Sequence, residues 1–166
     1  MPYAYNLKLV AVALVSAVLL AACGSAPAPV TMADLPTYSG ATELQPGNSP
    51  IATTLKNNEQ QAAAMGQKIE QKAFTLPKDA TWDKLIAFYG EQLKAKGWKE
   101  GVAAGGVGSG MANDIMKNAL AQANAGNDMF KTAIFTRGKQ TLTVMRMSGA
   151  TKRDEVQLLL SLNTNP

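Results

Sequence analysis

The chain begins with a short apolar segment, and its nature determines which residues belong to the folded protein. One positive charge, Lys8, leads into twelve largely apolar residues from Leu9 to Leu20. A membrane-spanning helix needs about 20 apolar residues, so this run is too short to cross a bilayer. A charged start, a short apolar stretch and small residues after it are typical of a secretory signal peptide. We therefore expect residues 1–22 to be removed and the fold to be built from Cys23 onward.

The residues around the predicted cleavage point carry a more specific pattern. The segment Leu20-Ala21-Ala22-Cys23 resembles the lipobox of bacterial lipoproteins, in which an aliphatic residue and two small residues precede a cysteine. This resemblance implies that diacylglycerol is attached to the Cys23 thiol and that the chain is held on the outer face of a membrane, periplasmic or at the cell surface. Gly24 replaces the aspartate that would favour inner-membrane retention, which leaves the choice of membrane open. An ordinary signal peptide with a chance cysteine, or a signal anchor, is the alternative.

Composition limits what the mature part can do. It would hold 144 residues, enough for one domain. Without Lys8 it has 15 Lys and Arg against 12 acids, a spread net charge of +3, so nucleic acid is not an expected partner. Cys23 is the only cysteine, which excludes a disulfide within the domain. There is no histidine, the commonest general base and transition-metal ligand. We expect no catalytic residues, no metal and no cofactor.

An Ala- and Pro-rich stretch, 23–36, follows the predicted cleavage point and shows no periodicity. We expect it to be a flexible tether that keeps the domain near the membrane without docking on it. Residues 37–166 are expected to form one α+β domain, a two-layer sandwich in which helices cover an antiparallel sheet. The expected helices are 50–66, 81–96 and 111–125, and the expected strands are 69–76, 130–137, 141–147 and 156–162.

The best-defined element is the helix 81–96. Thr81 can cap its first turn, and Gly97 suits the left-handed position after its last. Trp98 can then contact Leu93, the apolar pair that often accompanies such an end. We expect this helix to cover the leucine-rich face of the last strand, formed by Val156, Leu158, Leu160 and Leu162.

Part of this pattern resembles extracytoplasmic lipoprotein domains that have no assigned activity. The shared features are an aromatic pair, a leucine, lysines and Gly-Trp at one helix end, together with a preceding Phe-Thr-Leu-Pro and a Tyr-x-Gly-Ala segment. In this chain they are Phe88-Tyr89, Leu93, Lys94, Lys96, Gly97-Trp98, Phe74–Pro77 and Tyr38–Ala41. The resemblance implies the same location and transfers no activity.

A glycine-rich loop, 101–110, follows the helix 81–96. Its glycines miss the Gly-x-Gly-x-x-Gly spacing because Met111 occupies the last position, and no Lys-Ser/Thr pair follows Gly110. A P-loop is therefore excluded. We interpret 101–126 as a flexible insertion that carries a helix.

The helix of this insertion supplies the candidate binding surface. Methionine side chains adapt to irregular surfaces, so its apolar residues could contact a protein partner or line a groove for an apolar ligand. Packing of the helix on its own sheet is the plainer alternative. The candidate residues are Met111, Ile115, Met116 and Leu120.

Two polar clusters are candidates for chemistry. Asp79 and Asp83 flank a helix start, where carboxylates cap the helix or interact with its dipole more often than they catalyse. Arg137, Lys139 and Arg146 could gather as an anion patch on one hairpin, but a solvated face is the preferred interpretation.

Together these features predict a membrane-anchored extracytoplasmic lipoprotein that acts as a non-catalytic binding or accessory module. It could be a small subunit of a larger envelope complex. A carrier of an apolar small molecule or lipid is the first alternative. An enzyme based on carboxylates and lysine is the second.

Overall fold

The computed structural model describes residues 27–101, 109–127, 129–149 and 155–165. In the helix that starts at Ser109, the side chains of residues 109–113 and 116 are outside this description. The predicted signal peptide, Cys23 and most of the glycine-rich loop also lie outside the described residues. Within the described part, none of the helices combines the length and the apolar character needed to cross a membrane.

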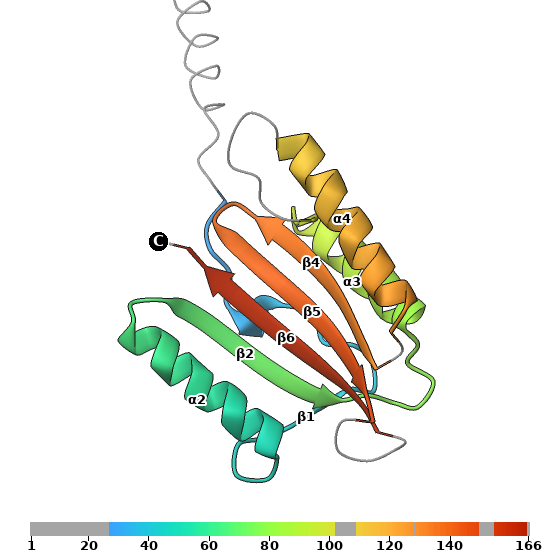
Figure 1. Cartoon of the computed structure of the whole chain (residues 1–166). Coiled ribbons are helices and arrows are strands. Elements are labelled where there is room, and N and C mark those ends of the chain that lie inside the picture. The colour runs from blue at the N-terminus through green and yellow to red at the C-terminus, as the bar shows by residue number, and fades with distance from the viewer. Residues whose placement is uncertain (1–26, 102–108, 128, 150–154, 166) are drawn as a thin grey trace, which may run out of the picture.

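Six antiparallel strands form a single sheet in the order β1-β2-β6-β5-β4-β3 (Figure 1). The predicted α+β class is confirmed. Four long strands make the centre of the sheet, and a two-residue strand lies at each edge. The long strands are β2 (Lys68–Thr75), β4 (Phe130–Arg137), β5 (Gln140–Ser148) and β6 (Val156–Thr164), and the edge strands are β1 (Thr42–Glu43) and β3 (Lys99–Glu100).

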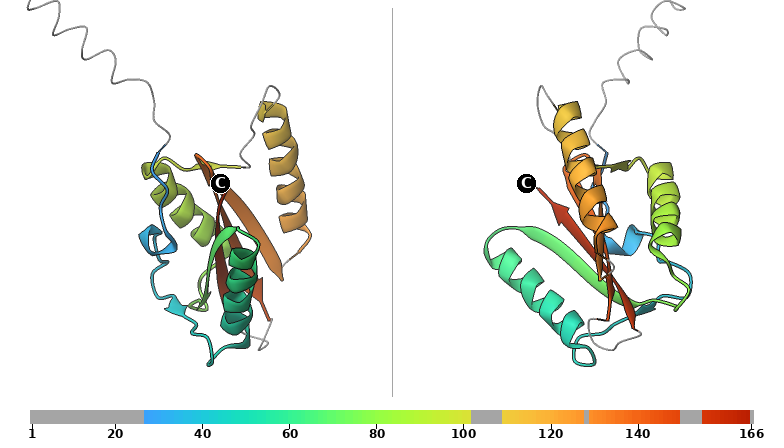
Figure 2. Two further views of the ribbon diagram at one scale, coloured as in Figure 1. Left: turned by 90° about the vertical axis from the view of Figure 1, so that its left-hand side faces the viewer. Right: turned by 45° about the vertical axis from the view of Figure 1, so that its right-hand side comes forward.

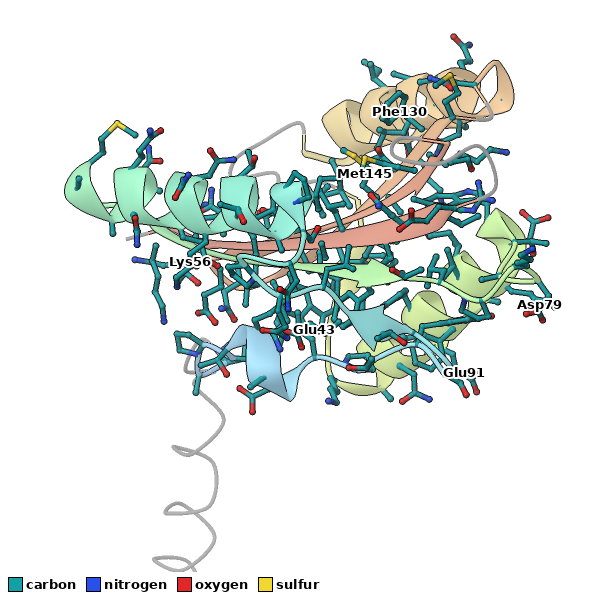
Figure 3. All side chains as sticks on the ribbon, turned by 90° about the horizontal axis from the view of Figure 1, so that it is seen from below. Glu43, Lys56, Asp79, Glu91, Phe130 and Met145 are labelled. Carbon is teal, nitrogen blue, oxygen red and sulfur yellow. The ribbon has the colours of Figure 1, made fainter. Side chains whose placement is uncertain are left out.

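Helices lie on both faces of this sheet (Figures 2 and 3). Figure 3 shows α2 (Pro50–Ala64) and α4 (Ser109–Ala125) on one face, with α3 (Trp82–Ala95) and the short 3-10 helix η2 (Met32–Asp34) on the other. The predicted Thr81 cap is present, because the Thr81 side chain accepts a hydrogen bond from Lys84 N. At the start of α2, the Ser49 side chain accepts one from Ala52 N in the same way.

The core lies between the sheet and α3. The predicted leucine face is confirmed: Leu158, Leu160 and Leu162 of β6 are at most 2% exposed. Alternate residues of a strand share one face, so the neighbouring strands add their own apolar residues to this layer. They are Phe74, Ala133, Phe135, Leu142 and Val144, and α3 contributes Leu85, Tyr89 and Leu93.

The end of α3 follows the predicted geometry. Gly97 has φ +81°, the left-handed conformation that favours glycine. Trp98 N donates to Leu93 O at 3.0 Å, and Gly97 N donates to Lys94 O at 3.0 Å. These are the two hydrogen bonds of a Schellman motif, and they bring the buried Trp98 back onto the core.

The tether prediction is wrong for residues 27–36. Met32 and Leu35 are buried in the core. The Val30 backbone exchanges two hydrogen bonds with the buried Gln140 side chain, from Val30 N at 2.8 Å and to Val30 O at 2.7 Å. Arg137 also donates to Ala28 O at 2.7 Å. The prolines predicted a linker that does not dock on the domain. Instead, the side chains of Gln140 and Arg137, which are distant in sequence, form hydrogen bonds with the backbone of this segment.

The sheet has an internal two-fold arrangement that neither composition nor periodicity revealed. Each half includes a two-residue edge strand, a helix and a long strand: β1-α2-β2 and then β3-α4-β4. Glu43 pairs with Phe74 in the first unit, and Glu100 pairs with Phe135 in the second. The residue after each glutamate donates to the long strand at 2.8 Å, Leu44 N to Ala73 O and Gly101 N to Ile134 O.

Strands β5 and β6, at the middle of the sheet, are related by the same two-fold arrangement. Phe74 pairs with Leu158 in one half, and Phe135 pairs with Leu142 in the other. The Val144–Leu160 pair maps onto itself, so the approximate axis passes through it. Helix α4 thus holds in the second unit the place of α2 in the first. Helix α4 is therefore a regular element of the fold. The interpretation of 101–126 as an insertion does not fit this symmetry.

Tyr89 gives this core a pH dependence. Its ring is fully buried, and its hydroxyl lies near the Tyr38 backbone without making a hydrogen bond of good geometry. Burial raises the pKa of the Tyr89 phenol well above its usual value of 10.0. The folded state therefore holds this proton more tightly than the unfolded state does. Stability from this source is complete below pH 10 and is lost as the pH rises above it.

We therefore expect Tyr89→Phe to lessen the fall in Tm between pH 9 and pH 11. At pH 7 it should be neutral or stabilising by about 1 kcal/mol, because it removes a buried hydroxyl with no partner. Circular dichroism melts across this range measure both effects. Tyr38→Phe is the control and should follow the wild-type curve. A wild-type pH profile in Tyr89→Phe would contradict the assignment.

Candidate functional site

A hollow of about 270 Å³ lies at the β4 edge of the sheet, between α3 and α4. We call it the α4 groove. Its walls are mainly apolar, with one acid and one base, Glu100 and Lys117, among them. The lining residues are Trp82, Ile86, Glu100, Gly101, Lys117, Leu120, Ala121, Asn124, Thr132, Ala133 and Ile134.

The groove exists because β3 is short. Its two residues pair only with Thr136 and Phe135, so the rest of the β4 edge lacks a neighbouring strand. Asn124 of α4 takes that place at one position: Thr132 N donates to its Oδ1, and its Nδ2 donates to Thr132 O, both at 2.8 Å. The amide thereby satisfies edge groups that would otherwise be free to pair with another chain.

The first unit has a hollow of about 270 Å³ at the corresponding place, between α2 and the β2 edge. Its helix residues Leu55 and Glu59 lie 65 positions before Leu120 and Asn124. Glu59 accepts a hydrogen bond from Gln71 N at 2.5 Å, just as Asn124 does from Thr132. The same edge protection is thus built twice.

The two hollows differ in chemistry. The hollow beside α2 is crossed by ion pairs, with Lys72 Nζ 2.8 Å from Glu43 Oε2 and Lys56 Nζ 3.0 Å from Glu59 Oε2. The α4 groove instead has Ala133 where the first unit has Lys72, and it gains Trp82 and Ile86 from α3. The α4 groove is therefore better suited than the hollow beside α2 to an apolar ligand or side chain.

The structure divides the predicted binding surface of α4. Leu120 is half-buried in the groove, whereas Ile115 is 64% exposed. Five positions along an α-helix correspond to about 140° around its axis, so these residues face different sides. The side chains of Met111 and Met116 lie outside the described residues. All other described side chains of α4, apart from Asn124, are exposed.

Sequence reasoning missed the walls that α3 and β4 supply. Trp82 and Ile86 lie on α3, and nothing in the local sequence indicates that they meet α4. One signal was present: Asn124 is a polar residue with low helix propensity near the end of an alanine-rich helix.

Asp79 and Asp83, the candidate catalytic carboxylates, have other roles in the structure. Asp79 lies 2.9 Å from Lys84 Nζ. The hydrogen bond from Lys84 lowers the pKa of Asp79, and the same contact raises the pKa of Lys84. Asp83 lies in the first turn of α3 and is exposed. Both residues fit a helix start better than acid–base chemistry.

The hypothetical anion patch is split between two ends of the sheet. Arg137 ends β4 and Lys139 lies in the β4–β5 turn, whereas Arg146 donates to Ala80 O at 3.4 Å and to Ser148 Oγ at 2.7 Å near the start of α3. Across the ranges the structure describes, no three His, Cys, Asp or Glu side chains are grouped so that they could hold a metal ion.

No protein-family model, curated protein or solved structure matches the chain. The assignment of a role therefore depends on the sequence pattern and the geometry described above.

Proposed function

We propose that the protein is a lipid-anchored extracytoplasmic module that binds a membrane-protein partner through the α4 groove. The anchor is supported by the lipobox resemblance around Cys23. The binding role is supported by the contrast between the two equivalent hollows: among the described residues, the one beside α4 has a mainly apolar lining and no ion pair within it.

The size of the groove favours one apolar side chain of a partner. Pockets for small-molecule ligands span roughly 300–1,000 Å³, and the groove, at about 270 Å³, falls just below that range. Interfaces are commonly dominated by a single large side chain seated in a pocket. Lys117 and Glu100 at the groove offer polar contacts around it.

A photo-crosslinking residue at Lys117 tests this proposal in intact cells. We expect one defined product with an integral membrane protein. The variant Ala121→Trp should reduce that product at least about ten-fold, because the indole occupies the space of the incoming anchor. Gln122→Trp adds the same ring to the outer side of α4 and should leave the product unchanged. A product that persists in Ala121→Trp, or is lost equally in Gln122→Trp, would contradict the groove as the contact.

An apolar small molecule is the second candidate, favoured by the joint presence of Trp82, Ile86 and Leu120 in the groove. Native mass spectrometry of the purified chain distinguishes the two. A carrier retains bound mass that Ala121→Trp excludes, whereas a partner-binding module shows the mass of the lipidated chain alone.

A further inference from the structure

The domain has a basic end at the place where the N-terminal segment leaves it. Arg137 joins three parts of the chain there, with Nε donating to Lys96 O at 3.1 Å and a terminal nitrogen donating to Ala28 O at 2.7 Å. Lys99 belongs to β3, where it pairs with Thr136 next to Arg137. Lys139 completes the two-residue turn between β4 and β5, and its carbonyl accepts a hydrogen bond from Asn165 N.

The side chains of Lys96, Lys99 and Lys139 are exposed and that of Arg137 is half-buried. We call these four residues the basic end. Two acids adjoin it, Asp34 and Glu100. The Asp34 carboxylate accepts 2.8 Å hydrogen bonds from both Thr31 N and Thr31 Oγ1, which lower its pKa and keep it charged. Positive charge predominates there because four basic residues stand beside two acids.

The opposite end of the domain, at the start of α3, carries acids and bases together. Asp79 and Asp83 lie there with Lys84, which pairs with Asp79, and with Arg146, which donates to Ala80 O. Asp79 is 77% exposed, and Figure 3 shows it at the periphery of the molecule. Opposite charges are thus mixed at the start of α3, whereas basic residues outnumber acidic ones at the end from which the N-terminal segment leaves.

The length of chain before this segment limits how far the domain can lie from the membrane. Five residue steps separate Cys23 from Ala28, whose carbonyl is held by Arg137. Even fully extended, they reach only about 18 Å. The Debye length at physiological salt is about 8 Å, so a domain on so short a link samples the electrostatic field of the lipid surface.

We propose that the basic end docks on anionic phospholipid headgroups and fixes the orientation of the domain on its membrane. The proposal rests on the lipid anchor at Cys23. Lysine and arginine near an anionic surface are attracted to it, and this attraction acts together with the anchor without needing a specific pocket. It would turn the Asp79 end away from the bilayer and leave the α4 groove at the side, accessible to a protein in the same membrane.

The test uses the full lipidated chain in vesicles. Because Cys23 is acylated, an added cysteine is the only free thiol, and it carries a fluorophore quenched by nitroxide headgroups. Asn165→Cys places the label beside Lys139, and Ser39→Cys places it in the turn near Pro77, toward the other end. In vesicles containing phosphatidylglycerol, we expect the label at 165 to be quenched at least about three-fold more than the label at 39.

A pair of charge variants supplies the matched control. Lys99→Glu with Lys139→Glu should bring quenching at 165 down to its level in phosphatidylcholine vesicles. Lys56→Glu with Lys78→Glu changes net charge equally and should leave it high. Equal quenching at 165 and 39, or equal effects of the two double variants, would overturn the orientation. Absence of acyl mass on the chain would instead refute the anchor itself, so the two failures are distinguishable.

Discussion

Cys23→Ser should shift the protein from the membrane fraction to the soluble extracytoplasmic fraction. A serine hydroxyl lacks the nucleophilic sulfur that accepts diacylglycerol, so no acyl chain would be attached. Stable anchoring requires about two chains, each contributing about 0.8 kcal/mol per buried methylene. Loss of all of them should remove essentially all membrane retention. Intact mass spectrometry of the purified chain and carbonate washing of membranes measure the two parts of the effect.

Gly24→Ser is the control for this experiment, because it alters the next residue and keeps the thiol. It should remain acylated and membrane-bound. If the wild-type chain carries no acyl mass and keeps residues 1–22, the segment is a signal anchor and the lipoprotein assignment is wrong. Because Ala28, Val30 and the residues after them are held by the domain, the fold itself should not change.

Leu160→Ala should cost about 3–5 kcal/mol of unfolding free energy, the range for leucine in a rigid core. Leu160 is 2% exposed and lies on the approximate two-fold axis, between Lys72 of β2 and Val144 of β5. The surrounding strands are long and fully paired, so they cannot collapse into the cavity. Urea unfolding followed by circular dichroism measures the change.

Leu159→Ala is the matched control. It removes the same atoms from the next residue of β6, which is half-buried on the opposite face of the sheet. We expect a cost of about 1 kcal/mol there, since the side chain loses less contact area on truncation. Similar costs at the two positions would show that the face toward α3 is not the principal core.

The proposed function and the proposed orientation support each other physically. A short link and a basic end would hold the domain in one orientation, and a binding groove at its side would then meet partners in the plane of the membrane. The two equivalent hollows differ in their lining. The one beside α2 contains the Lys72–Glu43 ion pair and serves as a protected sheet edge, whereas the one beside α4 is lined by Ala133 and Trp82 and is the candidate contact surface.

Local sequence determined a large part of this protein. The alternation of Leu158, Leu160 and Leu162 specified a strand and the face it buries, because side chains two apart share one side of a strand. Thr81 and Gly97 specified where α3 begins and ends, because capping depends on neighbouring backbone groups alone. The pattern before Cys23 likewise predicts an anchor without reference to the fold.

Tertiary structure alone decided the rest. Gln140 pins Val30 across 110 residues, and Asn124 completes the edge of β4; no local pattern encodes such contacts, because each depends on how separate elements meet. The α4 groove is formed in the same way, by Trp82, Leu120 and Ala133 from three elements. Periodicity specifies the face that an element buries, whereas the neighbour it meets depends on the packing of the whole chain.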